Sequence, residues 1–466
     1  MQHQMHHEAH QPEGLTARLA TLSLAVAGGA IPGAAIEAAR RLMHHAFGVA
    51  VAGSSLPVSS IARAAIGDAP GQCLVFGSAG SHAAQDAAFA NGAIGHASLL
   101  EDSGAGGMQA GSHPATYVFP AALAAAQVCG ASGMDLIRAV CAAYETVDRL
   151  GALMPDEVAL RGFRAVAVLG PFGAAAAAGV LSGLSATQLA AAYGIAANLA
   201  GGLNQGFVDG TMEPYLHPAF AARNGLLAAR LAGAGCGASP LSLEGERGFF
   251  ATFAGRAPKA ASLDPAVPEL AVCRVGAKDY ATCLYNQGTL ALVARRFPHG
   301  LVAADIERVR LARPASGLHG LCAPGVAAAP SHANALQRQM SARFTTAAAL
   351  LGKPVDSAVW FAQAQDDAQV AALAERIDIV THDSPGIRIE VLLRDGRRLL
   401  AEAGADTALV FSSERVSATF TGRVRPVLGE RTEEAAALLA ELPHLRTLDR
   451  LTALFKRQAA PVHRAL

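Results

Sequence analysis

Residues 91–123 read NGAIGHASLLEDSGAGGMQAGSHPATYVFPAAL, and residues 132–151 read SGMDLIRAVCAAYETVDRLG. The first segment contains a Gly-rich loop with ionisable and hydrogen-bonding side chains, which are His96, Glu101, Asp102, Ser103 and His113. The sequence on both sides of this loop is apolar and predicts two buried helices. Loops held between rigid helices commonly carry chemistry, and a packing core does not need such a polar group. We therefore expect a functional site in this loop.

The pattern that surrounds this segment is helical from Thr16 to about Gly255. A proline at position 32 precedes a long predicted helix over residues 35–51. Ser132, with Asp135 three positions later, is a good N-cap for the next helix, and Ser185 caps another. The sequence therefore predicts a large all-helical domain.

The pattern changes after about residue 262. A short β-like run covers residues 270–275, and residues 306–311 alternate like a half-buried strand. Residues 387–393 and 397–401 flank an Asp-Gly turn, which predicts a hairpin, while residues 341–351 and 367–376 are helical in pattern. We expect a mainly α fold with a smaller α+β domain, in which residues 14–270 and 403–466 form the helical domain and residues 271–402 form the smaller one.

Composition limits the classes of partner. The 466-residue chain has 37 basic and 37 acidic residues, so no overall field attracts nucleic acid or a membrane. Hydrophobic residues make up 52% of the chain and charged residues 16%, which favours tightly packed helices and a homo-oligomer. The seven cysteines form no CxxC pair, and the N-terminus has no apolar signal core. We expect a cytoplasmic protein with reduced thiols.

Several motifs are absent from the sequence. It contains no GxGxxG at a strand-to-helix turn, no GxxxxGK[ST], no HExxH and no GxSxG. We therefore expect no cofactor and no metal, and we do not expect a serine hydrolase. The N-terminal histidines are interpreted as a disordered tail, with adventitious metal binding as the alternative; they are His3, His6, His7 and His10.

The remaining candidates suit proton chemistry. His113 precedes a helix whose N-terminal amides favour negative charge, and it is close in sequence to His96. Lys278 begins the smaller domain beside Tyr280 and Cys283, so it can face the His113 loop across a cleft between domains. Each of these residues also has an ordinary structural interpretation, and for Cys283 we favour an inert thiol.

Three residues on the predicted helices complete the candidates. Arg149 and Arg164 could each clamp a carboxylate, because a guanidinium matches a carboxylate with two parallel hydrogen bonds. Tyr144 could transfer a proton, although a tyrosine on an apolar helical face is usually a core residue. A small carboxylate is therefore the expected ligand.

Blocks along nearly the whole chain resemble the MmgE/PrpD family, whose members include 2-methylcitrate dehydratase, cis-aconitate decarboxylase and iminodisuccinate epimerase. The blocks are AAFANGAIGH at 87–96, HPATYVFPAALAAAQVCGASG at 113–133, AYETVDRLG at 143–151, LGPFGAAAAAGVLSGLSATQLAAAYGIAA at 169–197, DGTMEPYLHPAFAARNGLLAARLA at 209–232, LEGERGFF at 243–250 and KDYATC at 278–283. The resemblance implies a large helical domain, a smaller α+β lid and a homodimer.

The chain departs from the family pattern at several reactive positions. Where the dehydratases and decarboxylases read HALDFDDT, this chain reads HASLLEDS, so that the first aspartate falls on Leu99. Glu213, Pro214 and Tyr215 occupy a block that often contains a lysine. Arg164 stands where the family pattern has a histidine. The lysine of the family's KPYPTC block is kept as Lys278, and the position of a later family histidine falls near Gln287.

An epimerase needs only a base and an acid on opposite faces of one carbon. This requirement suits a chain that lacks some of the reactive residues of the family pattern. We therefore expect an isomerase closest in character to iminodisuccinate epimerase. The catalytic candidates are Lys278, His113, Tyr144 and His96, and the substrate-binding candidates are Arg149, Arg164, Asp102, Ser103, His217 and Tyr280. The alternatives are a dehydratase or decarboxylase and an inactive, carboxylate-binding paralogue.

Overall fold

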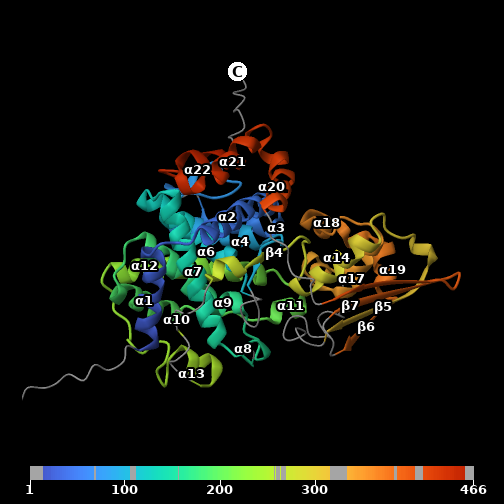
Figure 1. Ribbon diagram of the computed structural model, residues 1–466, viewed down its shortest axis with the longest axis horizontal. Coiled ribbons are helices and arrows are strands. Elements are labelled where there is room, and N and C mark those ends of the chain that lie inside the picture. The colour runs from blue at the N-terminus through green and yellow to red at the C-terminus, as the bar shows by residue number, and fades with distance from the viewer. Residues whose placement is uncertain are drawn as a thin grey trace, which may run out of the picture.

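The computed structural model describes residues 14–67, 70–104, 112–155, 157–256, 258, 263, 269–314, 333–382, 386–404 and 413–456. The chain forms a large helical part and a smaller α+β part, which confirms the predicted fold class (Figure 1). The N-terminal histidines and Cys322 lie outside the described residues.

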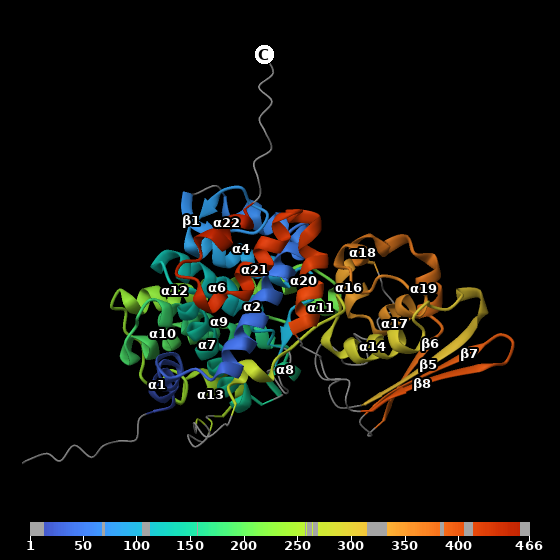
Figure 2. The same cartoon turned by 45° about the horizontal axis from the view of Figure 1, so that its top comes forward.

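The helical part consists of helices from both ends of the sequence. Its elements are α1 (Leu15–Gly28), α2 (Gly33–Gly53), α3 (Pro57–Ile66), α4 (Ala84–His96), α6 (Ala115–Cys129), α7 (Gly133–Leu153), α8 (Glu157–Leu160), α9 (Ala165–Leu181), α10 (Ala186–Asn198), α11 (Gln205–Asp209), α12 (Glu213–Gly233), α13 (Phe249–Ala254), α20 (Ser413–Leu428), α21 (Arg431–Ala440), the 3₁₀ helix η7 (Leu442–His444) and α22 (Asp449–Leu454). The C-terminal helices α20 and α21 pack against α2, as Figure 2 shows. A small antiparallel pair of β1 (Pro70–Leu74) and β2 (Ser81–His82) packs against α4 and α6 through β1.

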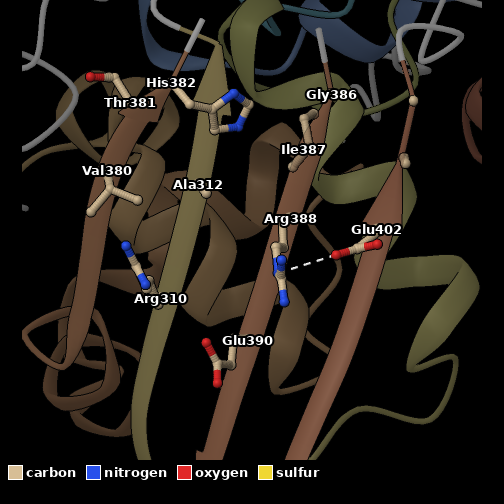
Figure 3. Close-up of a pocket in the computed structure, with 12 residues that line it drawn as sticks. Arg310, Ala312, Val380, Thr381, His382, Gly386, Ile387, Arg388, Glu390 and Glu402 are labelled. Atoms are coloured by element: carbon tan, nitrogen blue, oxygen red, sulfur yellow. Dashed lines mark ion pairs between the residues drawn. The ribbon is translucent and has the colours of Figure 1, made fainter. Parts of the chain in front are cut away.

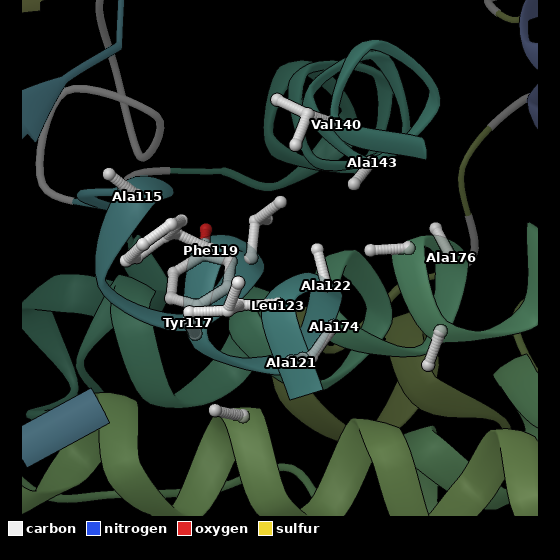
Figure 4. Close-up of a cluster of buried hydrophobic side chains, with 14 of the residues drawn as sticks. Ala115, Tyr117, Phe119, Ala121, Ala122, Leu123, Val140, Ala143, Ala174 and Ala176 are labelled. Atoms are coloured by element: carbon white, nitrogen blue, oxygen red, sulfur yellow. The ribbon is translucent and has the colours of Figure 1, made fainter. Parts of the chain in front are cut away.

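The centre of the helical part is α9, which packs against α6, α7 and α12. Its sequence AVAVLGPFGAAAAAGVL is apolar all round, as expected for a helix that is surrounded by other helices. Figure 4 shows how small side chains of α6, α7 and α9, including Ala122, Ala143 and Ala174, bring these helices together. Each larger apolar side chain buried here stabilises the fold by about 1.5–3 kcal/mol.

The smaller part contains a four-stranded sheet in the order β6-β5-β7-β8. The strands are β5 (Ile306–Pro314), β6 (Ile377–His382), β7 (Ile387–Leu393) and β8 (Arg398–Ala403), with β5 and β6 parallel and the other pairs antiparallel. Helices cover one face; the helical segments here are η3 (Leu284–Asn286), α14 (Gln287–Arg296), η4 (Ala303–Asp305), α16 (Ala335–Met340), α17 (Ala342–Leu350), α18 (Ala358–Gln363), η6 (Ala364–Asp366) and α19 (Ala368–Ala374).

Several local predictions are confirmed. Ser132 and Ser185 each form a capping box, with Asp135 and Gln188 respectively. The predicted hairpin is β7 and β8, joined through the Asp395-Gly396 turn. These features depend on neighbours in the sequence, so the sequence alone is sufficient to predict them.

The predicted β-like run over residues 270–275 is wrong. Residues 271–274 form the 3₁₀ helix η2 (Ala271–Arg274), and the short strand β4 (Gly276–Ala277) follows it. The backbone N–H of Ala271 donates to Glu145 Oε2 at 2.9 Å, and η2 packs against α7 and α2. A tertiary contact therefore overrides the local β pattern.

Two large clusters of buried apolar residues correspond broadly to the two parts, but each crosses the predicted domain boundary. Ala271 and Val272 belong to the cluster of the helical part. The second cluster includes Val49, Leu99 and Tyr215 from the helical part. The domain boundaries given above therefore stay a prediction, and the two parts share apolar contacts where they meet.

Among the described helices, none is both long and apolar enough to cross a bilayer. Helices α1 and α2 reach that length and hydropathy only as a pair, and the pair is bent by 96°.

A close approach between α4 and α12 gives a stability prediction. A Cβ at Gly92 would lie 2.7 Å from the Cα of Ala219, which belongs to the backbone of α12, whereas a Cβ at Gly95 of the same helix would meet nothing within 4 Å. Gly92→Ala should lower the free energy of unfolding by about 1–3 kcal/mol through overpacking. Gly95→Ala should be neutral or raise it by up to about 1 kcal/mol. Urea denaturation of both variants checks this, and equal effects would contradict the α4–α12 packing.

Candidate active site

A two-residue ladder joins the polar loop to the segment that carries Lys278. Asp102 and Ser103 form β3 (Asp102–Ser103), which pairs antiparallel with β4 so that Asp102 lies opposite Ala277. The backbone N–H of Lys278 also donates to the carbonyl of Glu101 at 3.2 Å. Segments that are far apart in sequence thereby place Glu101 and Lys278 side by side.

Glu101 is the centre of the polar cluster. Its Oε1 accepts a hydrogen bond from Lys278 Nζ at 2.5 Å and lies 3.7 Å from His113 Nδ1. Its Oε2 lies 3.4 Å from His96 Nδ1. The side chains of Glu101 and Lys278 are only 1% and 2% exposed. The structure thus brings Lys278, His113 and His96 together around one carboxylate.

The hydrogen bonds assign the neutral tautomers of both histidines. His113 Nδ1 lies 2.7 Å from the carbonyl oxygen of Asp102, which can only accept, so Nδ1 carries the proton. His96 Nε2 lies 2.7 Å from Arg164 Nη2, which can only donate, so the proton of His96 is on Nδ1. The protonated Nδ1 atoms of both rings are therefore on the side of the Glu101 carboxylate. The unprotonated Nε2 of His113 is left as a proton acceptor.

Asp102 connects the loop to two helices. Its Oδ1 accepts from the backbone N–H of Ala115 at 3.0 Å, in the first turn of α6, and its Oδ2 accepts from Tyr144 Oη of α7 at 2.7 Å. These bonds hold β3 against the helical part. Tyr144 therefore contacts the carboxyl group next to the Glu101 cluster.

Burial and charge set the protonation states of these groups. Burial raises the pKa of Asp102 to about 7, against the opposing hydrogen bonds from Tyr144 and Ala115. Burial also works to raise the pKa of Glu101, but Lys278 and the two histidines outweigh it and hold this pKa well below its usual range. Burial lowers the pKa of His113 well below its usual range and that of His96 to about 4. At neutral pH the cluster contains an ionised Glu101 and two neutral histidines.

The backbone is strained at two positions on either side of Glu101. Leu99 and His113, with φ of 56° and 48°, are the non-glycine residues with positive φ in the described part of the chain. Such a conformation costs about 1–3 kcal/mol and persists only where the surroundings impose it. Leu99 packs in the second apolar cluster, and the carbonyl of Asp102 holds the His113 ring. Strain at both positions is consistent with a functional site.

Arg164 lies next to the cluster, and Arg149 does not. Arg164 precedes α9, is 4% exposed, donates to His96 and to the carbonyl of Pro214, and stacks on Phe207 with its Cζ 4.4 Å from the ring centroid. Burial lowers the pKa of Arg164 to about 10, so its guanidinium stays charged at neutral pH. Arg149 pairs with Glu145 at 2.8 Å on α7. Of the two predicted carboxylate clamps, Arg164 is therefore the one beside the histidines.

The remaining predicted site residues come from several elements around the Glu101 cluster. Ser103 is buried in β3. His217 of α12 is also buried, and its burial and the nearby charge of Arg164 lower the pKa of His217 to about 3. Tyr280 packs partly exposed against the second apolar cluster, and Cys283 is a buried cysteine of the same cluster. Gln287 Oε1 accepts from the backbone N–H groups of Asp279 and Tyr280, so it orders the turn after Lys278.

Two residues at the site were missing from the predicted roles. Glu101 belongs to the predicted polar loop without a predicted role, and its place beside Asp102 is a sequence signal for one. Gln339 of α16 accepts from Tyr215 Oη at 2.8 Å and donates to the carbonyls of Ala281 and Ser98. It thus joins the two parts of the chain, and no sequence motif marks it.

A cavity of about 690 Å³ on the open face of the sheet shares no residue with the Glu101 cluster. Figure 3 shows Arg310, Arg388, Glu390 and Glu402 on this face, where Arg388 and Glu402 form an ion pair at 3.1 Å. Opposite charges that pair across strands are typical of a solvated sheet surface. In the part of the chain that the structure describes, no three His, Cys, Asp or Glu side chains are arranged to hold a metal ion.

Comparison with known proteins identifies the family. Residues 17–261 match the MmgE/PrpD N-terminal domain. The chain belongs to the MmgE/PrpD family. It is 35% identical over 232 residues to the cis-aconitate decarboxylase-like protein oryM of Aspergillus oryzae, with 47% of each chain covered. It is 29% identical over 327 residues to the cis-aconitate decarboxylase of Aspergillus terreus, with 65% of each covered. The chain thus spans about half to two thirds of the length of these relatives.

The expectation of an isomerase is wrong. These MmgE/PrpD relatives are named as decarboxylases or decarboxylase-like, and decarboxylases are lyases. The expectation rested on three departures from the family pattern: the lost carboxylate at Leu99, the lysine missing from the block that begins at Glu213, and the gained Arg164. In the structure, Glu101 and Asp102 supply two buried carboxyl groups beside the buried Lys278, so acid–base groups are present without a carboxylate at Leu99.

The raised pKa of Asp102 predicts how stability depends on pH. Because its pKa is near 7 in the folded chain and about 3.8 when exposed, the folded chain holds an extra proton between these values. Folding should therefore weaken as pH rises through this window, by up to about 1.4 kcal/mol per pH unit. Asp102→Asn keeps the shape and cannot titrate, so its unfolding free energy should rise relative to the parent chain from pH 4 to pH 7. A pH-independent difference in urea titrations would contradict a protonated Asp102.

Proposed function

We propose that this chain is a lyase that releases CO2 from a small unsaturated tricarboxylic acid of the cis-aconitate type. The observation that supports the proposal most is the buried cluster of Lys278, Glu101 and His113 next to Arg164. The decarboxylase names of the MmgE/PrpD relatives point to the same reaction class.

The reaction needs a fixed carboxylate and one proton. When the CH2–carboxylate bond of cis-aconitate breaks, its electron pair forms a new C=C bond and CO2 leaves. The electron pair of the original double bond then moves to the far carbon, which takes up a proton. The product is a dicarboxylate with a terminal methylene group. A buried cation and a positioned acid are therefore the groups that the protein must supply.

In this proposal Arg164 holds a substrate carboxylate, and Lys278 is the acid. The Lys278 ammonium lies in a hydrogen bond to an ionised Glu101, which keeps the proton on nitrogen until a stronger base forms. A carbanion is such a base, and it takes the proton from Lys278 Nζ. His113, neutral with Nε2 unprotonated, can accept a hydrogen bond from a carboxylic acid group of the substrate that the reaction does not consume.

Substitutions at Lys278 test this role. Lys278→Met alone leaves a buried unpaired carboxylate, which commonly costs about 3–5 kcal/mol, so the informative variant is Lys278→Met with Glu101→Gln. This double variant removes both charges and should fold, yet release CO2 from cis-aconitate at least about 100-fold more slowly. CO2 trapping and proton NMR of the methylene product measure the rate.

Lys353→Ala is the matched control. Lys353 pairs with Asp367 at 2.7 Å in the smaller part and is 30% exposed, so its loss should leave the rate within about twofold of the parent chain. Equal rates for the control and the double variant would remove Lys278 from the mechanism. Absence of CO2 release by the parent chain from cis-aconitate and related tricarboxylates would overturn the proposed function.

A further inference from the structure

A second cavity, separate from the Glu101 cluster, lies where the end of α2 and the start of α3 meet the C-terminal helices. Its volume is about 510 Å³, within the size range of small-molecule sites. Cationic side chains reach it from three places in the sequence: Arg63 on α3, Arg431 at the start of α21 and Lys456 after α22. Ser54, Ser55 and Ser60 add hydroxyl groups to the lining.

The charged side chains that line this cavity are all positive. No carboxylate of the described residues lines the cavity, and neither Arg431 nor Lys456 pairs with a described carboxylate within 4.0 Å. Neighbouring arginines on the same C-terminal helices are paired, since Arg425 contacts Glu433 and Arg450 contacts Glu434 at 2.5 Å. Positive charge in a concave, partly apolar site raises the local potential for anions.

Two of the three cations, Arg63 and Lys456, donate hydrogen bonds that hold them in place. Arg63 Nη1 donates to the carbonyls of Ser54 at 2.8 Å and Phe76 at 3.3 Å, and its Nη2 donates to Ser60 Oγ at 3.2 Å. Lys456 Nζ donates to Ser81 Oγ at 2.8 Å. These bonds orient the side chains. The cavity is therefore built before any ligand arrives.

The same cavity has an apolar lining. Phe76 and Phe455 are buried, their ring centroids are 5.6 Å apart, and Leu428 packs in the same cluster. Gly77, with φ of 76°, adds no side chain, and a Cβ there would lie 3.1 Å from Arg63 Nη1. A ligand that fits this lining carries an oxyanion at one end and a short carbon chain at the other.

We propose that this cavity binds a small organic oxyanion, a phosphate or carboxylate on a short alkyl chain, as a site separate from the candidate active site. Arg431 and Lys456 supply the charge that attracts the oxyanion, and the serine hydroxyls complete its hydrogen bonds. The phenylalanine rings pack on the carbon chain.

Calorimetric titration of the full chain with propyl phosphate and with butyrate tests the site, because these probes share a propyl group and differ in the anion. At least one probe should bind with Kd below about 10 mM. Arg431→Gln with Lys456→Gln keeps most of both side-chain stems and should raise that Kd at least about tenfold. Arg295→Ala with Arg446→Ala, two exposed arginines outside the cavity, removes the same charge and should leave Kd within about twofold.

Ser55→Asp provides an independent variant, because Ser55 is an exposed residue of the lining and its substitution spares the core. The added carboxylate should also raise Kd at least about tenfold by repelling the anion. The proposal is overturned if neither probe binds, if both cavity variants bind as the parent chain does, or if the control pair weakens binding equally. Which probe is bound decides between a phosphate and a carboxylate ligand.

Discussion

The buried ion pair between Lys278 and Glu101 is the interaction on which the rest of the site depends. Their backbones are joined by a hydrogen bond and their side chains by a second one, so that the pair fixes both the loop and the segment after η2. An uncompensated charge at this depth is costly, so each partner requires the other. Both histidines stay neutral because burial opposes their protonation, together with Lys278 at His113 and with Arg164 and Lys278 at His96, while Glu101 favours it.

The predictable part of the fold was the part set by local chemistry. Capping boxes at Ser132 and Ser185 and the Asp395-Gly396 hairpin follow from side chains a few residues apart. The segment at Ala271 was not predictable in this way, because its conformation depends on a bond to Glu145, which is distant in sequence. The β3–β4 ladder is likewise too short to leave a periodic signal.

The site was predicted in outline and misjudged in detail. The idea that His113 and Lys278 come from separate segments and meet agrees with their shared contact to Glu101. Arg149 could have been separated from Arg164 by its spacing, since Glu145 lies four positions earlier on the same helix. The absence of a carboxylate at Leu99 was a weak basis for predicting the reaction class. The strained backbone and buried side chain of Leu99 suggest that it shapes the turn before Glu101.

The β3–β4 ladder also has a consequence for biosynthesis. Glu101 and Lys278 are 177 residues apart, so the ribosome must finish much of the chain before they can meet. Long-range pairings of this kind form late, because loop closure costs entropy before the contact repays it. A nascent chain would therefore hold an incomplete acid–base group until translation has passed Lys278. The group could then assemble while the C-terminal helices are still to be made.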